Sequence, residues 1–491
     1  MRKTVLWLFL VVSLAAQGQQ FSIPLIKKHY QSLTSNAEMM HFLDSLRKTS
    51  AVIHLDTTGY SVNDKVIPLL RIQQDEVYEE KPFIYLFAQQ HGDEPSGKEG
   101  LLLLAEDFAA GNLHHILDSV NVLLIPQSNP DGADQHRRRT SQDVDMNRDH
   151  LVYQAPETRV IQEVFEKYAP IVTVDIHEYY PYGASWIDFG YRRDFDIQVG
   201  TLTNPNISDS IIRYHKTKTL PYIKKHLEKS GFSFFEYTLG HFPSGERLRQ
   251  STTDINDGRQ SFGITNTLSF ITEGMNGKDS LHRIRERALS QYETAKAFCE
   301  FTADNLTEVK RLVSNAQSAL LDTLRQKTTI RQDHFNSEDT LCYPLKNVAT
   351  GEDTVFHVTN YFGDIRPLLE VEAPKGYLVP KRDTLLVALL KHNHFKYSSY
   401  KRDKRDLILG RQILEVDRVE NEGIKTNYPL LMDKLMNDIN PEDYFFVPVR
   451  QLRRHKVIIA FEPQSMFGIG FYDLFSGYMK KNRLFPVLRV E

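Results

Sequence analysis

The chain alternates between short apolar runs and amphipathic stretches across its N-terminal two thirds. Short apolar runs between turn residues predict buried strands, and apolar residues that recur every three or four positions predict helices. Strands that alternate with helices in this way predict a doubly wound α/β sheet, mostly parallel and covered by helices on both faces. The predicted strands cover residues 83–89, 120–127, 171–178 and 265–273, and the predicted helices cover 97–111, 155–169, 215–231 and 280–303.

The pattern changes after about residue 305. One more helix is predicted over residues 306–327. Beyond it, short apolar runs such as DTVFHVTNYFG and HKVIIAFEP are broken by turn residues, which is typical of a β-rich domain. We therefore expect an α/β domain over residues 21–304, a connecting helix over 305–330 and a smaller β-rich accessory domain over 331–491.

The first residues have a pattern of their own. Arg2 and Lys3 precede the apolar run TVLWLFLVVSLAA, and small and polar residues follow it. This order is typical of a secretory signal peptide, and the run is shorter than the ~20 residues that span a bilayer. We expect a signal peptide over residues 1–18 and a secreted or periplasmic protein without stable membrane insertion. An N-terminal anchor or core helix is the alternative.

Composition narrows the class of partner. The net charge is −3 at pH 7, so nothing favours binding to nucleic acid or to an anionic membrane. Cys299 and Cys342 are too few for a disulfide framework. One bridge between them and two separate buried thiols both fit the sequence, and the sequence does not define an oligomeric state.

Side chains that can bind a metal ion stand at the ends of two of the predicted strands. His91 and Glu94 stand in QQHGDEPSG directly after strand 83–89, and His177 lies at the end of strand 171–178. With 18 His and 63 acidic residues, about two His-x-x-acid pairs arise by chance, so the first pair alone is weak evidence. A catalytic zinc takes three protein ligands and keeps a fourth position open. The alternative for His177 is a buried histidine bonded to a backbone carbonyl.

Three further motifs carry candidate chemistry. The sequence NPDG at 129–132 predicts a tight turn. Arg137–Arg139 and Arg148, beside Asn147, offer planar guanidinium groups that suit carboxylates and oxyanions, although a charged run is also common on a solvated face. Glu273 ends an apolar strand, where a carboxylate is costly unless it is paired or functional. Beside a metal-bound water it would serve as a general base; the alternative is a carboxylate near the start of the next helix.

The order of the motifs resembles the zinc metallocarboxypeptidase family, the carboxypeptidase A-like peptidases. His-x-x-Glu, Asn-Pro-Asp-Gly, an arginine, Asp-x-Asn-Arg, Asp-x-His and Thr-Glu-Gly follow one another along the chain. The resemblance covers about residues 21–304 and implies a mixed, mostly parallel sheet flanked by helices, with one Zn2+ per chain. The C-terminal region resembles the tails of secreted bacterial members.

The resemblance implies a metal site and a base. His91, Glu94 and His177 would hold the zinc. Asp145 would orient a zinc-bound histidine, which fits the general behaviour of metal-bound imidazole. Glu273 would take a proton from the zinc-bound water and pass it to the leaving amine.

The resemblance also implies groups that bind the substrate. Arg138 matches the family arginine that polarises the scissile carbonyl, while Arg137 and Arg139 stay open because the residues that follow depart from the family pattern. Asn147 and Arg148 would bind the terminal carboxylate of a peptide.

One family residue has no counterpart in the expected place. Family members carry a tyrosine shortly before the catalytic glutamate, but RLRQSTTDINDGRQ contains none, and Tyr237 is the nearest one upstream.

The leading expectation is a zinc carboxypeptidase that acts on peptides. Hydrolysis of peptidoglycan stem peptides (muropeptides), deacylation of small molecules and, less favoured, a non-catalytic binding protein are the alternatives.

Overall fold

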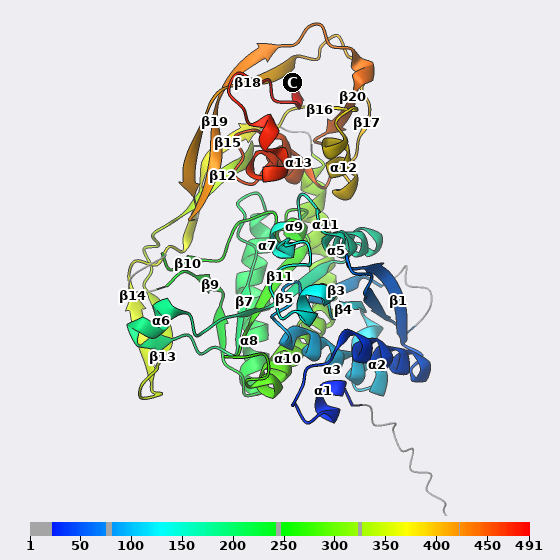
Figure 1. Ribbon diagram of the computed structural model, residues 1–491, viewed down its shortest axis with the longest axis vertical. Helices are drawn as coiled ribbons and strands as arrows, with labels where there is room; N and C mark the ends of the chain where they lie inside the picture. The colour runs from blue at the N-terminus through cyan, green and yellow to red at the C-terminus, as the bar shows by residue number, and fades with distance from the viewer. Residues whose placement is uncertain (1–21, 75–80, 242–246, 323–326, 422) are drawn as a thin grey trace, which may run out of the picture.

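The computed structural model describes residues 22–74, 81–241, 247–322, 327–421 and 423–491. The expected signal peptide lies outside these residues. Among the residues described, no helix is long and apolar enough to cross a bilayer. Figure 1 shows an N-terminal part built around a large sheet, and above it a C-terminal part that is rich in strands.

A mixed sheet of eight strands forms the centre of the N-terminal part, in the order β1-β2-β4-β3-β5-β11-β7-β8. The strands are β1 (Ile53–Tyr60), β2 (Val66–Ile72), β3 (Phe83–Ala88), β4 (Asn121–Ile125), β5 (Val172–Tyr179), β7 (Ile197–Gly200), β8 (Phe234–Glu236) and β11 (Leu268–Met275). The four central strands β4, β3, β5 and β11 are parallel neighbours. Both edges add antiparallel pairs, β1 with β2 and β11 with β7. The expected fold class, a mixed and mostly parallel sheet with helices, is therefore confirmed.

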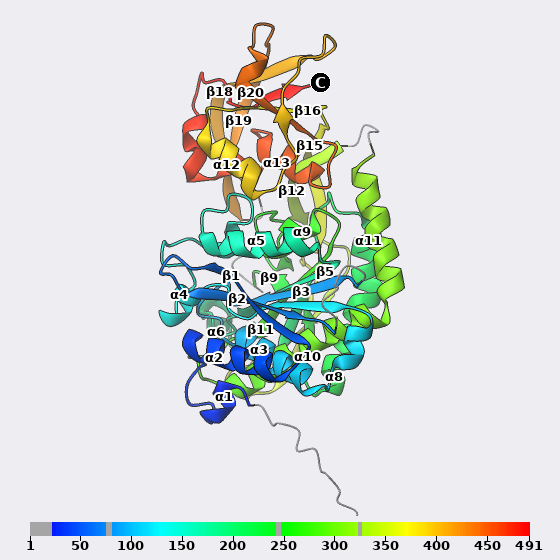
Figure 2. The same ribbon diagram turned by 90° about the vertical axis from the view of Figure 1, so that its right-hand side faces the viewer.

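Successive residues of the central strands point to opposite faces of the sheet and enter two separate cores. In β3, Ile84 and Leu86 join the core on one face, while Tyr85 and Phe87 join the core on the other. Figure 2 shows α5 and α9 above the sheet, and α2, α3, α8 and α10 below it. The bounds are α2 Asn36–Thr49, α3 Ser96–Ala110, α5 Pro156–Tyr168, α8 Leu220–Lys229, α9 Gly258–Gly263 and α10 Ile284–Asp304.

The structure differs from the sequence prediction at NPDG. Instead of a tight turn, Asn129 caps the short helix α4 (Pro130–Asp134), and its Oδ1 accepts a hydrogen bond of 2.9 Å from the Gly132 amide. Asn is a strong helix N-cap and Pro suits the first helical turn, so the same residues serve both structures. The remaining short elements are α1 Pro24–Lys27, η1 His114–Asp118, η2 Met146–Arg148, α6 Ala184–Phe189, β6 Tyr191–Arg192, α7 Asp209–Tyr214, η3 His215–Thr219, β9 Thr238–Leu239 and β10 Arg249–Gln250.

Helix α11 (Leu306–Leu320) leads to the C-terminal part. There, six antiparallel strands form a sheet in the order β17-β20-β16-β21-β18-β19. The elements are β16 Gly376–Pro380, α12 Thr384–His392, β17 Ser398–Ser399, β18 Ile408–Asn421, β19 Ile424–Leu435, η4 Pro441–Asp443, β20 Tyr444–Pro448, α13 Arg454–Phe461, η5 Ile469–Phe471, η6 Asp473–Tyr478 and β21 Leu488–Val490.

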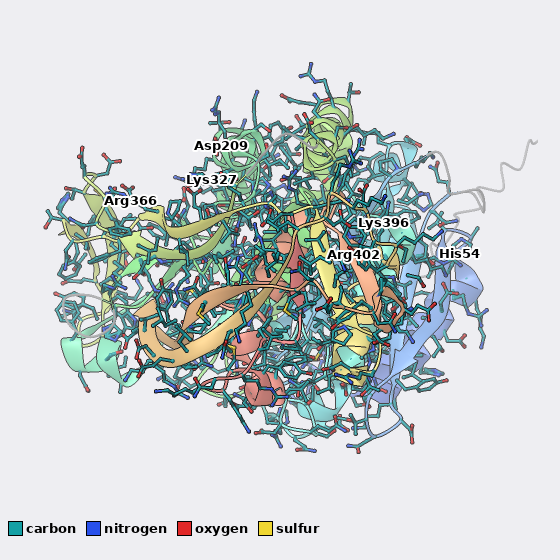
Figure 3. The ribbon with its side chains drawn as sticks, turned by 90° about the horizontal axis from the view of Figure 1, so that it is seen from above. His54, Asp209, Lys327, Arg366, Lys396 and Arg402 are labelled. Carbon is teal, nitrogen blue, oxygen red and sulfur yellow. The ribbon has the colours of Figure 1, made fainter. Side chains whose placement is uncertain are left out.

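Residues 327–372 extend from the C-terminal part as an arm. It consists of β12 (Lys327–Phe335), β13 (Leu341–Asn347), β14 (Asp353–Val358) and β15 (Asp364–Glu372). β12 pairs with β15, whereas β13 lies between β14 and β6 of the N-terminal part. Figure 1 shows the arm running down beside β9, β10 and α6. In the view from above, Arg366 of the arm lies on the far side of the molecule from His54 of β1 (Figure 3).

The two parts share a hydrophobic core. Leu151 and Ile255, from loops of the N-terminal part, lie in one buried cluster with Val457 and Phe461 of α13. A contact of this kind removes apolar area from water on both sides, so it stabilises both parts together.

A buried lysine adds polar contacts to this interface. Lys456 of α13 is 2% exposed. Its Nζ donates to the carbonyl of His150 at 2.8 Å, to the Tyr153 hydroxyl at 3.1 Å and to Ser261 Oγ at 2.8 Å. The three acceptors belong to the N-terminal part, so this single side chain connects α13 to two of its segments.

The two cysteines are not joined. Cys299 is buried in α10, while Cys342 is exposed on β13. The bridge that the sequence left open is therefore wrong, and only one of the two thiols is buried.

Candidate active site

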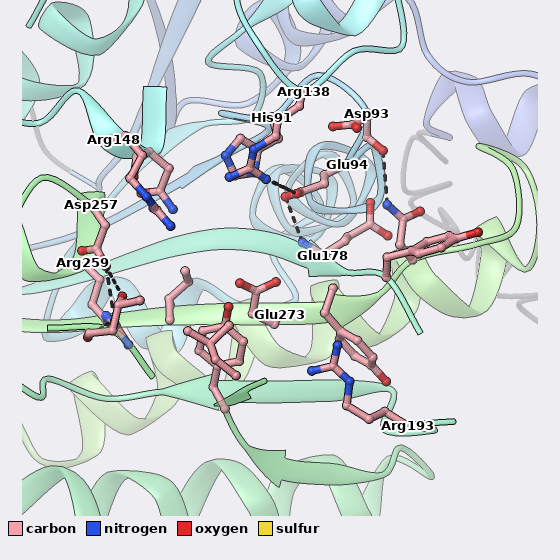
Figure 4. Close-up of a pocket in the computed structure, with 18 residues that line it drawn as sticks. His91, Asp93, Glu94, Arg138, Arg148, Glu178, Arg193, Asp257, Arg259 and Glu273 are labelled. Carbon is pink, nitrogen blue, oxygen red and sulfur yellow. Dashed lines mark hydrogen bonds and ion pairs between the residues drawn. The ribbon is translucent and has the colours of Figure 1, made fainter. Parts of the chain in front are cut away.

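The three expected metal ligands lie together at the carboxyl end of neighbouring strands. His91 and Glu94 occupy the turn between β3 and α3, and His177 is near the end of β5, which is parallel to β3. His91 Nδ1 lies 2.8 Å from Glu94 Oε1 and 3.1 Å from His177 Nδ1, and His177 Nδ1 lies 3.0 Å from Glu94 Oε2. All three residues are buried, and Figure 4 shows His91 and Glu94 at the cavity.

Glycine makes the ligand turn possible. A Cβ on Gly92 would stand 2.1 Å from the carbonyl carbon of Gly132 in α4. The turn can therefore pack against α4 only without a side chain at this position, and this packing sets the direction in which His91 points.

The second nitrogen of each imidazole meets a carboxylate. His91 Nε2 lies 3.2 Å from Asp145 Oδ1, and His177 Nε2 lies 2.8 Å from Asp175 Oδ1. A proton on Nε2 donates to the carboxylate and leaves the Nδ1 lone pair free for a metal, which is the arrangement that metal-bound histidines usually show.

The donor set fits zinc. Two imidazole nitrogens and one carboxylate oxygen are zinc donors, and ligands at about 2.0–2.1 Å in a tetrahedron stand about 3.3 Å apart. The donor atoms here are 2.8 to 3.1 Å apart, close to that spacing. Burial would raise the pKa of the Glu94 carboxyl, but His91 and His177 together hold it below its usual range, so Glu94 is ionised.

Arg138 lies beside the ligands. Its Nε donates to Asp145 Oδ2 at 2.9 Å, and its Nη1 is 3.1 Å from His91 Nδ1. Arg137 and Arg139 instead make contacts to Asp143, at 2.6 Å and 2.9 Å. Of the three arginines that the sequence left open, the cavity is lined by Arg138.

Glu273 lies on β11, paired in register with His177 on β5. It is 7% exposed. Burial raises the pKa of the Glu273 carboxyl to about 7; His177 opposes this shift, the charge of Glu94 adds to it, and a hydrogen bond from the Tyr237 hydroxyl opposes it. A carboxyl that gains and loses a proton near neutral pH has the property that a general base needs.

Asn147 and Arg148 lie in η2 and line the same cavity. Asn147 Oδ1 accepts a hydrogen bond of 2.9 Å from the amide of Gly258, which leaves its side-chain NH2 group as the available donor. Burial lowers the pKa of Arg148, but Asp254, Asp145 and Asp257 raise it above its ordinary value. Arg148 is therefore cationic at the cavity wall.

The cavity has a volume of about 360 Å³. Figure 4 shows Arg148 and Arg259 at one end, Arg193 at the other, and Glu273 between them. Tyr237, Arg193 and Glu178 also line it and were not identified as site residues from the sequence. Asp175 belongs to the Asp-x-His motif of the sequence but received no role there, although strand alternation places it on the same face as His177, two positions on.

Comparison with known proteins agrees with this geometry. Residues 39–186 match the family model described as zinc carboxypeptidase. This stretch of the chain is therefore similar to a zinc carboxypeptidase domain, and it contains His91, Glu94 and His177.

Curated relatives are also carboxypeptidases. Carboxypeptidase 2 of Trichophyton rubrum is 25% identical over 366 residues, which cover 71% of this chain and 66% of that protein. Carboxypeptidase 2 of Trichophyton tonsurans is 23% identical, covering 83% of this chain and 76% of that protein. The chain thus spans about two thirds of the length of the first of these relatives. These relatives are fungal and give no support to the bacterial origin expected from the sequence.

A solved metallo-carboxypeptidase from Pseudomonas aeruginosa resembles the fold with a TM-score of 0.44 and 17% identity, covering 57% of this chain and 71% of that chain. The carboxypeptidase A of Helicoverpa armigera has a TM-score of 0.44 and 14% identity, covering 57% of this chain and 75% of that one.

Proposed function

We propose that this protein is a zinc-dependent carboxypeptidase that hydrolyses the C-terminal amide bond of peptides. The observation that carries the proposal is the position of Glu273. Its carboxyl is buried, has a pKa of about 7 and lies in one cavity with Arg148 and with His91 and Glu94, two members of the His91–Glu94–His177 cluster. A base, a metal site and a cation in one cavity are the groups that such a cleavage needs.

The residues of the chain divide the work. Bound zinc would supply a water of lowered pKa and polarise the scissile carbonyl. Glu273 takes the proton of the attacking water and passes it to the leaving amine. Arg138 donates to the oxygen that becomes negative as the carbonyl is attacked. Arg148 and the side-chain amide of Asn147 bind the terminal carboxylate and so fix which bond is cut.

Asp145 and Asp175 act on the metal ligands rather than on the substrate. Each holds the imidazole next to it in one tautomer and one orientation, and each raises the basicity of the ring. The Tyr237 hydroxyl, which donates to Glu273, limits the rise in the pKa of that carboxyl.

We also infer that residues 1–18 direct export, because their basic and apolar segments have the order of a signal peptide.

The test compares wild type with Glu273→Gln on a peptide library read by mass spectrometry, with zinc measured on both. We expect wild type to trim single C-terminal residues, and the variant to lose at least about 10²-fold in rate while it keeps about one zinc. Zinc-loaded wild type that trims no peptide would contradict the proposal. Muropeptides and acylated amino acids, tested in parallel, then identify the alternative substrate.

A further inference from the structure

Part of the cavity is lined by a segment with little structure of its own. We call residues 237–241 and 247–257 the wall segment; it contributes Tyr237, Leu239, Thr252 and Asp257 to the cavity. Its two strands, β9 and β10, have two residues each. Such a short hairpin is only marginally stable by itself, so the wall segment needs partners outside it.

The arm supplies side-chain partners at residues 251–253. Gln332 Nε2 of β12 donates to Thr253 Oγ1 at 2.6 Å, and the His334 ring donates from Nε2 to the carbonyl of Ser251 at 3.2 Å. These four residues are buried, each 4% exposed or less. Hydrogen bonds between buried partners are costly to break because the partner that remains is left unsatisfied.

Backbone groups of the arm extend the same contact. The Phe362 amide donates to the carbonyl of Leu248 at 3.0 Å, and the Gln250 amide donates to the carbonyl of Phe362 at 3.1 Å. The edge of β10 is therefore paired with the arm as well as with β9.

A tyrosine of the arm holds the other end of the wall segment. The Tyr343 hydroxyl of β13 lies 3.0 Å from Thr238 Oγ1, next to Tyr237 in the chain. The Tyr343 ring packs against Phe235, with 5.2 Å between ring centroids, and is fully buried. The arm thus contacts both halves of the wall segment, at residues that are chain neighbours of the cavity-lining Tyr237, Leu239 and Thr252.

These contacts continue inward to Arg259 at the end of the cavity. Arg259 donates to Ser251 Oγ at 2.7 Å and to the carbonyl of Thr252 at 2.9 Å. His334 bonds Ser251 itself, and Gln332 bonds Thr253, which directly follows Thr252 in the chain. A shift of residues 251–253 would therefore move a cavity-lining guanidinium as well as the wall.

We propose that the arm of the C-terminal part positions the wall segment and thereby sets how the peptide substrate is bound; this rests on the proposed function. Gln332 and Tyr343 are positioning residues, because they do not themselves line the cavity. Gln332 acts through Thr253, and Tyr343 acts through Thr238 and through the cavity-lining Arg193, which also hydrogen-bonds the Tyr343 hydroxyl. Their loss should weaken substrate binding and leave the metal site unchanged.

The experiment uses the full chain with Gln332→Leu, Tyr343→Phe and a matched control, Thr328→Val. Thr328 lies on the same strand as Gln332 and is buried, but its Oγ1 bonds His455 of α13 at 3.0 Å, within the C-terminal part. We expect KM for a trimmed peptide to rise about fivefold to tenfold in the first two variants, with kcat within about twofold. Zinc content should stay at the wild-type level in all three.

Hydrogen exchange gives a readout that does not depend on activity. Amides of residues 247–253 should exchange faster in Gln332→Leu than in wild type, whereas Thr328→Val leaves them unchanged. A double-mutant cycle of Gln332→Leu with Thr253→Val should show non-additive KM values, because one bond joins the pair.

Unchanged exchange and unchanged KM in Gln332→Leu and Tyr343→Phe would overturn the proposal. Equal changes in the control would do the same, since they would indicate general destabilisation. If wild type trims no peptide, the proposed function fails, and hydrogen exchange still decides whether the arm holds the wall segment.

Discussion

At the scale of single residues, the carboxylates behind the metal ligands are the feature with the sharpest consequences. Asp175 is 1% exposed. Its Oδ1 accepts a hydrogen bond of 2.8 Å from the side-chain amide of Gln90, in addition to its contact with the His177 ring. Asp145 instead bonds both His91 and Arg138. Each carboxylate is therefore itself fixed by a different neighbour, Asp175 by Gln90 and Asp145 by Arg138.

We expect Asp145→Asn and Asp175→Asn each to weaken zinc binding about tenfold to a hundredfold, because an amide no longer fixes the tautomer or raises ring basicity. Competition with a chromogenic chelator measures the affinity. Asp143→Asn is the control, since Asp143 is exposed and bonds Arg137. Equal affinity in all three variants and wild type would contradict the role given to the carboxylates.

The three consecutive arginines provide their own control series. We expect Arg138→Ala to lower kcat/KM about 10²-fold to 10³-fold, as loss of a donor to a developing oxyanion does elsewhere. Arg137→Ala and Arg139→Ala, whose side chains contact Asp143, should stay within about twofold of wild type. Steady-state kinetics on one peptide decides the matter; the idea fails if Arg137 or Arg139 proves the sensitive residue.

Sequence reasoning reached the site residues whose type and order are distinctive. His91, Glu94 and His177 were predicted to meet, and the structure brings them within hydrogen-bond distance of one another. Tyr237 received no role from the sequence because it lies far from Glu273 along the chain. It directly follows β8, however, and β8 pairs with β7, which pairs with β11, so the sheet brings Tyr237 to the glutamate. A contact made through strand pairing of this kind leaves no local signal in the sequence.

At the scale of elements, the central strands were predictable because they are buried on both faces and read as continuous apolar runs. The edge strands β1 and β8 are only partly buried, and their mixed patterns gave no clear signal. The helices were found through their apolar spacing, as in α5, predicted over 155–169 and observed over Pro156–Tyr168. Most ends of elements differed by a few residues, which depends on caps more than on periodicity. The helix predicted over 306–327 differs more, because it ends at Leu320 and Lys327 already begins β12.

One contact between α8 and α10 makes stability depend on pH. His226 Nε2 lies 2.8 Å from Glu293, and its Nδ1 lies 3.3 Å from Glu300. Hydrogen bonds to these two carboxylates raise the pKa of His226 to about 9. Because the pKa of His226 is higher in the folded state than in the unfolded state, protonation of His226 stabilises the folded protein. This contribution is fully present below the unfolded pKa of about 6.5 and is lost as pH rises through about 9.

His226→Gln should therefore lower the free energy of unfolding by about 1 kcal/mol at pH 6, a value reduced for solvent screening of this partly exposed group. The difference from wild type should vanish at pH 10. Denaturant unfolding at both values measures it, with His41→Gln, exposed on α2, as the control. A difference that grows with pH would reverse the sign and refute the argument.

At the scale of the whole molecule, the shared core predicts that the two parts unfold together. Calorimetry should give one transition, and removal of zinc with a chelator should lower its midpoint as a whole, because zinc binds only the folded site. Two transitions, of which only one responds to the chelator, would contradict this coupling.

Phe461→Ala tests the same coupling from the C-terminal side. Phe461 is 1% exposed in the shared cluster. Its truncation should therefore lower the free energy of unfolding by about 3 to 5 kcal/mol and lower the midpoint of the whole thermal transition. Leu385→Ala, at a residue 40% exposed on α12, is the matched control and should change the midpoint little.

The grip of the arm on the wall segment also has a consequence in time. A growing chain completes every ligand and the base long before it reaches Gln332 and Tyr343, so the site receives its last supports late in synthesis. An unfinished chain would hold its chemical groups without a finished wall. On the proposed role of the arm, a single nick within residues 327–372 would weaken substrate binding while leaving every catalytic side chain in place.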